Sequence, residues 1–235
     1  MKKNGFTLAE VLITLAIIGV VATMTLPALM TNTQEQQAKT GLRKAINTLT
    51  EAAQMHSSID GYSFSGFQVA ADIDDEEADN TFSMEALLRA RTAIDFTKTG
   101  NQEFDVETVG NAVGASSVIG NNATYVHFRD GSVLIYDPNN VIAIDDNAEL
   151  QDDGQPLGYI VAIDTNGTKG PNQLSNCQGN ALGADETQQN ALVNYADLDA
   201  TCAKGNRAIK DQFLLRLRGT VVQPEGPAAV WAFNN

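Results

Sequence analysis

Histidine, cysteine and aromatic residues are scarce in this sequence. Its 235 residues include two histidines, two cysteines and one tryptophan, and Phe, Trp and Tyr together make up 6%. The sequence also lacks a serine in a nucleophile elbow, a glycine-rich phosphate loop and a Cys–His arrangement with zinc-ligand spacing. These absences remove the usual signals of hydrolases, nucleotide-binding enzymes and zinc proteins, so we expect a structural protein and not an enzyme.

Positive charge is scarce as well. The chain has 15 lysines and arginines against 29 aspartates and glutamates, which gives a formal net charge of -14. Direct binding of nucleic acid is therefore not expected, because it depends on positive charge that releases counterions from the phosphates. The acidic excess fits a soluble head that faces solvent.

One long hydrophobic run is present, at the N-terminus. A short basic leader, residues 1–5 with Lys2 and Lys3, precedes about 25 mostly apolar residues that end near Met30. At a rise of roughly 1.5 Å per residue such a run is long enough to cross a bilayer. An ordinary secretory signal ends its apolar core in a small-residue cleavage site, whereas here the small residue, Gly5, comes before the core.

Glu10 is a carboxylate near the start of this apolar run. A carboxylate inside a membrane segment costs roughly 2.5–3.5 kcal/mol, so such a residue usually has a functional partner. The alternative is a signal anchor in which Glu10 simply lies at the level of the lipid headgroups.

The order Gly5, Phe6, Thr7, Leu8, Glu10 ahead of an apolar helix resembles the type IV prepilin signal. The resemblance covers about the first 30 residues. It implies that a prepilin peptidase cuts after Gly5 and methylates the new amino group of Phe6. It also implies that this amine meets Glu10 of a neighbouring subunit, and that Pro27 lies where pilins commonly carry a proline that kinks or opens the helix.

The helix is expected to continue beyond the membrane. Apolar residues recur at three- and four-residue steps between residues 31 and 56, with polar residues between them. We predict one helix over 6–56, with residues 6–30 as the transmembrane and assembly half and 31–56 as an amphipathic half, loosened at Pro27 and Gly41. Fifty residues of helix would span roughly 75 Å, far more than a bilayer, so the second half must pack its apolar stripe elsewhere.

The predicted partner of that stripe is an antiparallel sheet in a head formed by residues 57–235. Strand patterns occur at 124–128, 132–136, 158–164 and 212–218, and at Val221 and Val222. Asp130-Gly131 favours a two-residue hairpin turn between the first two strands. Alternation places His127, Leu214 and Arg216 on a more exposed face of the sheet, so His127 is interpreted as a solvated strand residue and not as a catalytic base.

Between the long helix and these strands we expect a short helix and two polar loops. A short helix is predicted from about Ser83, with Met84, Leu87 and Leu88 as its apolar face. The acidic run 72–77 is interpreted as a solvated loop, with a cation site as the less favoured alternative, and residues 110–122 are rich in glycine and asparagine and are expected to form a loop. A long helix followed by an antiparallel sheet is an α+β arrangement, which is also the fold that the resemblance to pilins and pseudopilins implies.

The segment from Asp164 to Asn172 is similar to a turn found in many pilin-like heads. In those relatives a strand with an aspartate and a phenylalanine follows soon after, and here its counterpart, Asp211-Gln212-Phe213, comes after an insertion of about 35 residues, at about 173–206. Two interpretations stay open. Asn166-Gly167 forms a tight turn that Asp164 caps, which we favour, or Asp164, Asn166, the Thr168 carbonyl and Asp211 bind calcium.

The two cysteines, Cys177 and Cys202, both lie at the ends of this insertion. In an exported head we expect them to form a disulfide that closes the insertion into a surface lobe, because oxidising compartments favour disulfides. A loop of about 25 residues would contribute roughly 3–4 kcal/mol in the chain-entropy model. The alternative is a pair of buried free thiols.

Together these features predict a structural subunit of a type IV pilus or a type II secretion pseudopilus. The expected partners are the prepilin peptidase and other pilin or pseudopilin subunits. The precursor would reside in the bacterial inner membrane and the mature subunit in an extracellular or periplasmic filament. The alternative is an exported enzyme or ligand-binding domain that is held by an uncleaved N-terminal anchor.

Overall fold

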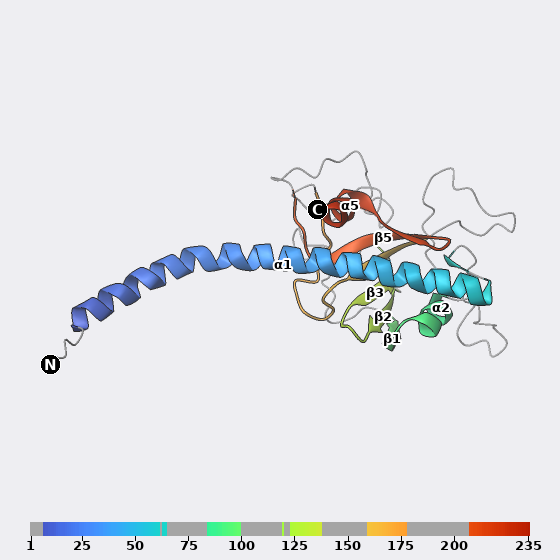
Figure 1. Cartoon of the computed structure of the whole chain (residues 1–235), viewed down its shortest axis with the longest axis horizontal. Coiled ribbons are helices and arrows are strands. Elements are labelled where there is room, and N and C mark those ends of the chain that lie inside the picture. The colour runs from blue at the N-terminus through green and yellow to red at the C-terminus, as the bar shows by residue number, and fades with distance from the viewer. Residues whose placement is uncertain are drawn as a thin grey trace. The chain divides into compact units, whose positions relative to one another are not determined.

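The computed structural model of the chain describes residues 7–61, 63–64, 84–99, 119, 123–137, 159–177 and 207–235 (Figure 1). The chain divides into two units, Met1–Gln37 and Ala38–Asn235, which are described separately below. Gly5 and Phe6, the acidic run 72–77, Ser83, the interior of the insertion and Cys202 lie outside the described residues. Of the predicted loop at 110–122 only Ile119 is described, and it is helical and 1% exposed.

The described elements confirm the predicted α+β arrangement. All strands form one antiparallel sheet with the order β1-β2-β3-β4-β5-β6, so that each strand pairs with its neighbour in the sequence. The elements are α1 (Leu8–Asp60), α2 (Met84–Arg91), β1 (Ile94–Thr99), β2 (Thr124–Phe128), β3 (Val133–Tyr136), β4 (Tyr159–Asp164), β5 (Gln212–Arg218), β6 (Val221–Pro224) and α5 (Gly226–Asn234).

The helix α1 continues without interruption through both positions where loosening was expected, Pro27 and Gly41. Its C-terminal end lies beyond the predicted His56. There His56 Nδ1 is 2.9 Å from the Asp60 carboxylate, one turn further on. The two side chains are four residues apart, a spacing at which they face each other on a helix.

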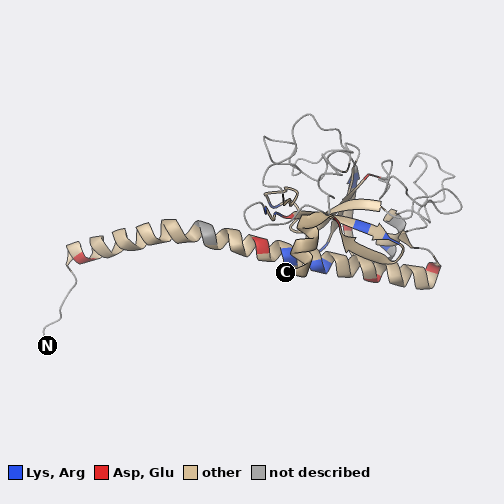
Figure 2. Ribbon diagram, turned by 90° about the horizontal axis from the view of Figure 1, so that it is seen from above, with Lys and Arg blue, Asp and Glu red and all other residues tan. Residues whose placement is uncertain are grey.

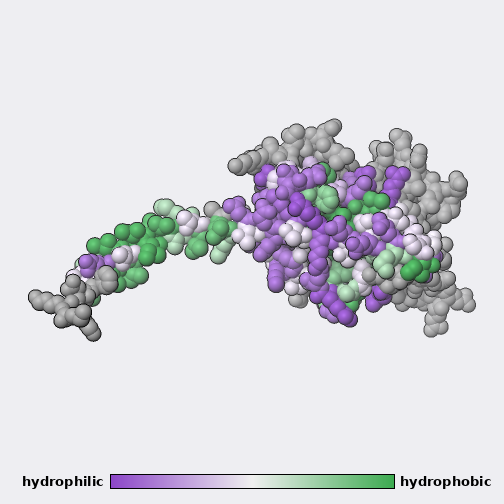
Figure 3. All heavy atoms as spheres, viewed as in Figure 1, coloured by the Kyte–Doolittle hydropathy of each residue, from purple (hydrophilic) through white to green (hydrophobic). Residues whose placement is uncertain are grey.

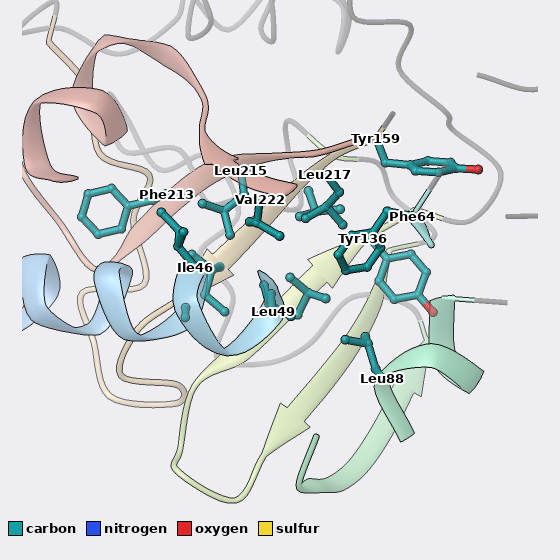
Figure 4. Close-up of a cluster of buried hydrophobic side chains, with 14 of the residues drawn as sticks. Ile46, Leu49, Phe64, Leu88, Tyr136, Tyr159, Phe213, Leu215, Leu217 and Val222 are labelled. Carbon is teal, nitrogen blue, oxygen red and sulfur yellow. The ribbon is translucent and has the colours of Figure 1, made fainter. Parts of the chain in front are cut away.

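In the second unit, α1 packs the predicted apolar stripe against one face of the sheet (Figure 4). Leu42 and Leu49 are essentially fully buried. The helix α2 adds its predicted face of Met84, Leu87 and Leu88. The partners on the sheet include Val126, Leu134, Val161, Ile163, Phe213, Leu215 and Leu217. Each fully buried Leu or Ile contributes roughly 1.5–3 kcal/mol, so this layer is the main stabilising contact of the head.

The other face of the sheet is also buried at most described positions, so the predicted greater exposure holds only toward the end of β5, where Arg216 is half-buried and Arg218 is exposed. Leu214 is 3% exposed and His127 is 8% exposed, so His127 is not a solvated residue. Its ring stacks on Phe96 of β1, with ring centroids 4.0 Å apart. Arg216 forms a bidentate ion pair with the buried Glu225: Nε lies 2.7 Å from one carboxylate oxygen and Nη2 lies 2.8 Å from the other. Strand alternation predicts which residues share a face, but it does not predict whether that face is covered.

The sequence analysis missed two elements, β1 and α5. Strand β1 forms the edge beside β2. Helix α5 has a proline in its first turn, where the missing amide hydrogen costs nothing. The helix is held by α1: Lys39 Nζ lies 4.0 Å from the centre of the Trp231 ring, and Arg43 Nε donates a 2.9 Å hydrogen bond to the Phe233 carbonyl. Arg207, which follows the insertion, lies 3.6 Å from the same ring.

The hairpin between β2 and β3 differs from the predicted two-residue turn. Phe128 N–H donates to the Ser132 carbonyl, which leaves residues 129–131 as a three-residue loop. Gly131 alone of these has a positive φ, 91°. A three-residue loop that ends in a left-handed residue is the next most common hairpin connection, and it uses the same Asp-Gly signal.

Beside this hairpin, α1 and the turn after β4 pack so closely that two glycines have no room for a Cβ atom. A Cβ atom on Gly41 would lie 2.7 Å from the Thr165 Cβ, and one on Gly167 would collide with the Gly131 carbonyl oxygen. Lys44 Nζ forms a 2.8 Å ion pair with the Asp130 carboxylate. The hairpin turn, the turn after β4 and α1 therefore pack together at positions that require glycine.

The close approach of Gly41 to Thr165 predicts whether replacing this glycine raises or lowers the stability of the head. In an open helix, Gly→Ala stabilises by about 1 kcal/mol. Here Gly41→Ala should instead lower the free energy of unfolding by about 1–3 kcal/mol, because Thr165 would have to move. Denaturation of the full chain in detergent micelles, followed by Trp231 fluorescence, measures the change.

Asn47→Ala is the matched control, because Asn47 is exposed on the same helix. It should stay within about 0.5 kcal/mol of the original chain. A Gly41→Ala chain that is more stable than the original would contradict the packing described here.

Candidate functional site

The first candidate site is the N-terminal end of α1, where Thr7 and Glu10 bind each other. The Glu10 carboxylate accepts hydrogen bonds from the Thr7 backbone N–H at 2.8 Å and from the Thr7 hydroxyl at 2.9 Å. The backbone N–H of Glu10 donates to the Thr7 hydroxyl oxygen at 3.3 Å. This reciprocal arrangement is a capping box, which satisfies amide hydrogens that have no partner within the helix. Glu10 thus has a local partner in the single chain.

The signal for this cap is present in the sequence. Thr7-Leu8-Ala9-Glu10 fits the pattern of a Ser or Thr followed three residues later by an acidic residue, ahead of an apolar run. Gly5 and Phe6, the predicted processing residues, precede the described part of the chain. Their roles, and that of Pro27 in assembly, stay predictions.

The first part of α1 exposes its large apolar side chains, and Figure 3 shows hydrophobic residues along the face in view. Glu10 is the only charged residue between Leu8 and Gln34, as Figure 2 also shows. Thr14, Thr23, Thr25 and Thr33 donate their hydroxyl hydrogens to backbone carbonyls one turn earlier, so these polar groups are satisfied within the helix. By length and composition α1 is able to cross a membrane. The large exposed residues include Leu8, Leu12, Ile13, Leu15, Ile17, Ile18, Met24 and Leu29.

The second candidate site is a pair of buried carboxylates at the junction of β4, the following turn and β5. Asp164 is fully buried. One of its oxygens accepts the backbone N–H groups of Asn166 at 3.0 Å and Gly167 at 2.7 Å, and the other accepts the Gln212 side-chain amide at 3.0 Å. Burial is the largest influence on this group, and it raises the pKa of Asp164 to about 7. The predicted capping of the Asn166-Gly167 turn by Asp164 is therefore present.

Asp211, which is 3% exposed, holds the same turn from the other side. Its carboxylate accepts the backbone N–H groups of Asn172 at 2.8 Å and Gln173 at 2.9 Å, and the Asn166 side-chain amide at 3.1 Å. Hydrogen bonds to ionised acceptors are stronger than neutral ones. Asp211 thereby fixes the segment that leads into the insertion to the start of β5.

The described ends of the insertion are joined by backbone pairing. Leu174 bridges Gln212, and Asn176 bridges Ala208 with N–H to carbonyl distances of 3.0 and 2.9 Å. Cys177 is 3% exposed. Cys202 lies outside the described residues, so the pairing of the two cysteines stays a prediction.

The structure brings together three of the four side chains or carbonyl groups predicted as alternative calcium ligands. Asp164, Asn166 and Asp211 share one hydrogen-bonded cluster, whereas Thr168 lies in the exposed part of the turn. Within the described residues, no three His, Cys, Asp or Glu side chains are placed to hold a metal ion. The carboxylate oxygens already accept N–H groups, which supports the turn interpretation, and calcium binding stays untested.

Comparison with known families finds a match that includes the residues of the first site. The family model described as the prokaryotic N-terminal methylation motif matches residues 1–26. No curated protein and no solved structure matches the chain. The matched residues contain the leader, Gly5, Phe6, Thr7 and Glu10, and the helix that follows is apolar and unbroken. The chain thus carries the N-terminal signal of type IV pilins and pseudopilins.

Proposed function

We propose that the chain is a structural subunit of a type IV pilus or a type II secretion pseudopilus. The prepilin peptidase would cleave between Gly5 and Phe6, and the mature subunit would enter the filament through the first part of α1. One observation carries this proposal: the methylation motif at residues 1–26 covers the leader and the start of an apolar helix whose large apolar side chains are exposed. Such a surface needs a lipid or protein environment.

The hydrogen bonding of the Glu10 carboxylate supports a role for this residue in filament assembly. Its carboxylate accepts two hydrogen bonds from Thr7, and in an assembled filament the amine of a neighbouring subunit would replace these donors. The presence of Glu10 argues against a tip-capping subunit, which in such families can lack it. The size of the head favours a minor or specialised subunit over a major one.

The rival proposal is an enzyme or ligand-binding domain on an uncleaved anchor. Against it we note that the buried Asp164 and Asp211 carboxylates hold a turn and that the buried Glu225 pairs with Arg216 at the start of α5. Processing at Gly5 separates the two proposals, since an anchored domain would keep its leader.

The first test replaces the residue before the cleavage site. Gly5→Leu should leave full-length precursor in the inner membrane, because Gly5 is the only small residue at the junction of leader and helix. Gly5→Ala, which stays small, is the matched control and should be processed to a larger extent. Immunoblots of membrane fractions measure the two lengths. Mature protein of normal length from Gly5→Leu would count against cleavage at this site.

The second test separates the charge of Glu10 from its role as a helix cap. Glu10→Gln keeps an oxygen that can accept the Thr7 N–H, whereas Glu10→Ala removes both charge and cap. Both variants should insert and be processed, and both should assemble at least about tenfold less filament, because breaking a desolvated charge pair costs about 3–5 kcal/mol. Sheared-filament yield is measured with each variant as the sole copy. Normal assembly of Glu10→Gln would show that the charge is not required.

The third test addresses the insertion. We propose a Cys177–Cys202 disulfide that orders the lobe, because residues 178–194 are polar and contain few large apolar side chains. Mass mapping of the exported protein without reductant should find the linked peptides. Cys177→Ser should raise protease sensitivity mainly between residues 176 and 204 and leave the helix-on-sheet core folded. Two free thiols in exported protein, or global unfolding of the variant, would overturn this proposal.

A further inference from the structure

The turn after β4 contains a chemically fragile pair, Asn166-Gly167. Apart from Asn4-Gly5 at the leader junction, no other Asn-Gly pair occurs in the sequence. At such a pair the Gly nitrogen, after losing its proton, attacks the side-chain carbonyl carbon of the asparagine. A new C–N bond closes a five-membered succinimide and ammonia leaves. Water then opens the ring to aspartate or isoaspartate, so an amide is exchanged for an acid.

The nucleophile of this reaction is held in the folded head. The Gly167 N–H is buried and donates to Asp164 Oδ1 at 2.7 Å. The same oxygen also accepts the Asn166 N–H at 3.0 Å, so it holds the two backbone N–H groups on either side of the Asn166 Cα atom. Loss of the Gly167 proton would place negative charge directly against this carboxyl group, and like charges at close range in a low-dielectric site repel strongly.

The electrophile is held as well. The Asn166 side-chain amide donates to Asp211 Oδ2 at 3.1 Å, which keeps the side chain turned toward Asp211. Asn166 Oδ1 is buried, and no hydrogen-bond donor among the described residues reaches it. Attack on the amide carbon develops negative charge on this oxygen, and without donors that charge is not stabilised.

We propose that Asp164 and Asp211 protect Asn166 from deamidation, and that the turn is a modification site which reacts only when it opens. The product would also keep the turn open. An acid at position 166 places an acceptor where Asp211 now receives a donor, and two carboxylates would face each other at hydrogen-bond distance. A transient opening of this junction, where the insertion leaves the core, would therefore become permanent.

Deamidation of the full-length chain in detergent micelles tests the proposal. The protein is incubated at mildly alkaline pH, and aspartate and isoaspartate at position 166 are quantified by peptide mass mapping. Folded original protein should react at least about tenfold more slowly than the same protein unfolded in urea, because reaction requires local opening. Equal rates in the folded and unfolded protein would overturn the proposal.

Two variants assign the protection to Asp164. Asp164→Ala removes the acceptor and should react at least about tenfold faster than the original protein. Asp164→Asn keeps an oxygen that can accept the Gly167 N–H but removes the negative charge, so its rate should fall between those of the original protein and Asp164→Ala. Circular dichroism checks that both are folded. A folded Asp164→Ala chain that reacts as slowly as the original would show that the carboxylate gives no protection. If that variant does not fold, the ratio of folded to unfolded rates in the original protein still decides whether the turn is protected.

Discussion

Burial of a single apolar stripe of α1 against the sheet is the contact on which the head depends. Leu42, Ile46 and Leu49 reach strands that are far away in the sequence, and α2 and α5 fill the space on either side. Between Leu8 and Met30 the same helix has no such stripe, because most of its side chains there are apolar and exposed. One continuous helix therefore combines two surfaces, one suited to lipid or other subunits and one suited to its own sheet.

Polar residues define the ends of this core. Lys44, Asp130, Asp164 and Asp211 connect the helix, the hairpin turn and the turn after β4, and each carboxylate among them accepts more than one donor. Buried polar groups of this kind stabilise a fold only when their hydrogen bonds are made. Here they fix the place at which a long insertion leaves and re-enters the sheet, so the insertion does not disturb the pairing of β4 with β5.

Periodicity predicted most of the elements, because apolar spacing directly reflects which side of an element is buried. The bounds of β2 and β5 and the apolar face of α2 match the prediction. The sequence was less informative where the burial or identity of a residue depends on a contact with a distant part of the chain. His127 is buried by a stacked Phe96 that lies on an unpredicted strand, and Gly41 is required by Thr165, more than 100 residues away. Helix α5 was missed because its Gly226-Pro227 start was not recognised as a helix beginning.

In the candidate sites, too, local patterns could be predicted from the sequence and contacts between distant residues could not. The motif from Gly5 to Glu10 was identified from residue order alone, and the family model confirms it. The Thr7–Glu10 cap was available from the sequence as a local pattern. The hydrogen bonds from Asn166 to both Asp164 and Asp211 could not be predicted from the sequence, since Asp211 is separated from the turn by the whole insertion.

The central claim is that this chain is a processed filament subunit, and the mass of its mature N-terminal peptide tests that claim most directly. Protein isolated from the membrane of a host with an active prepilin peptidase should begin at Phe6 and carry one methyl group on its amino nitrogen. A chain that keeps residues 1–5, or that begins at a site within the apolar helix, would contradict the account.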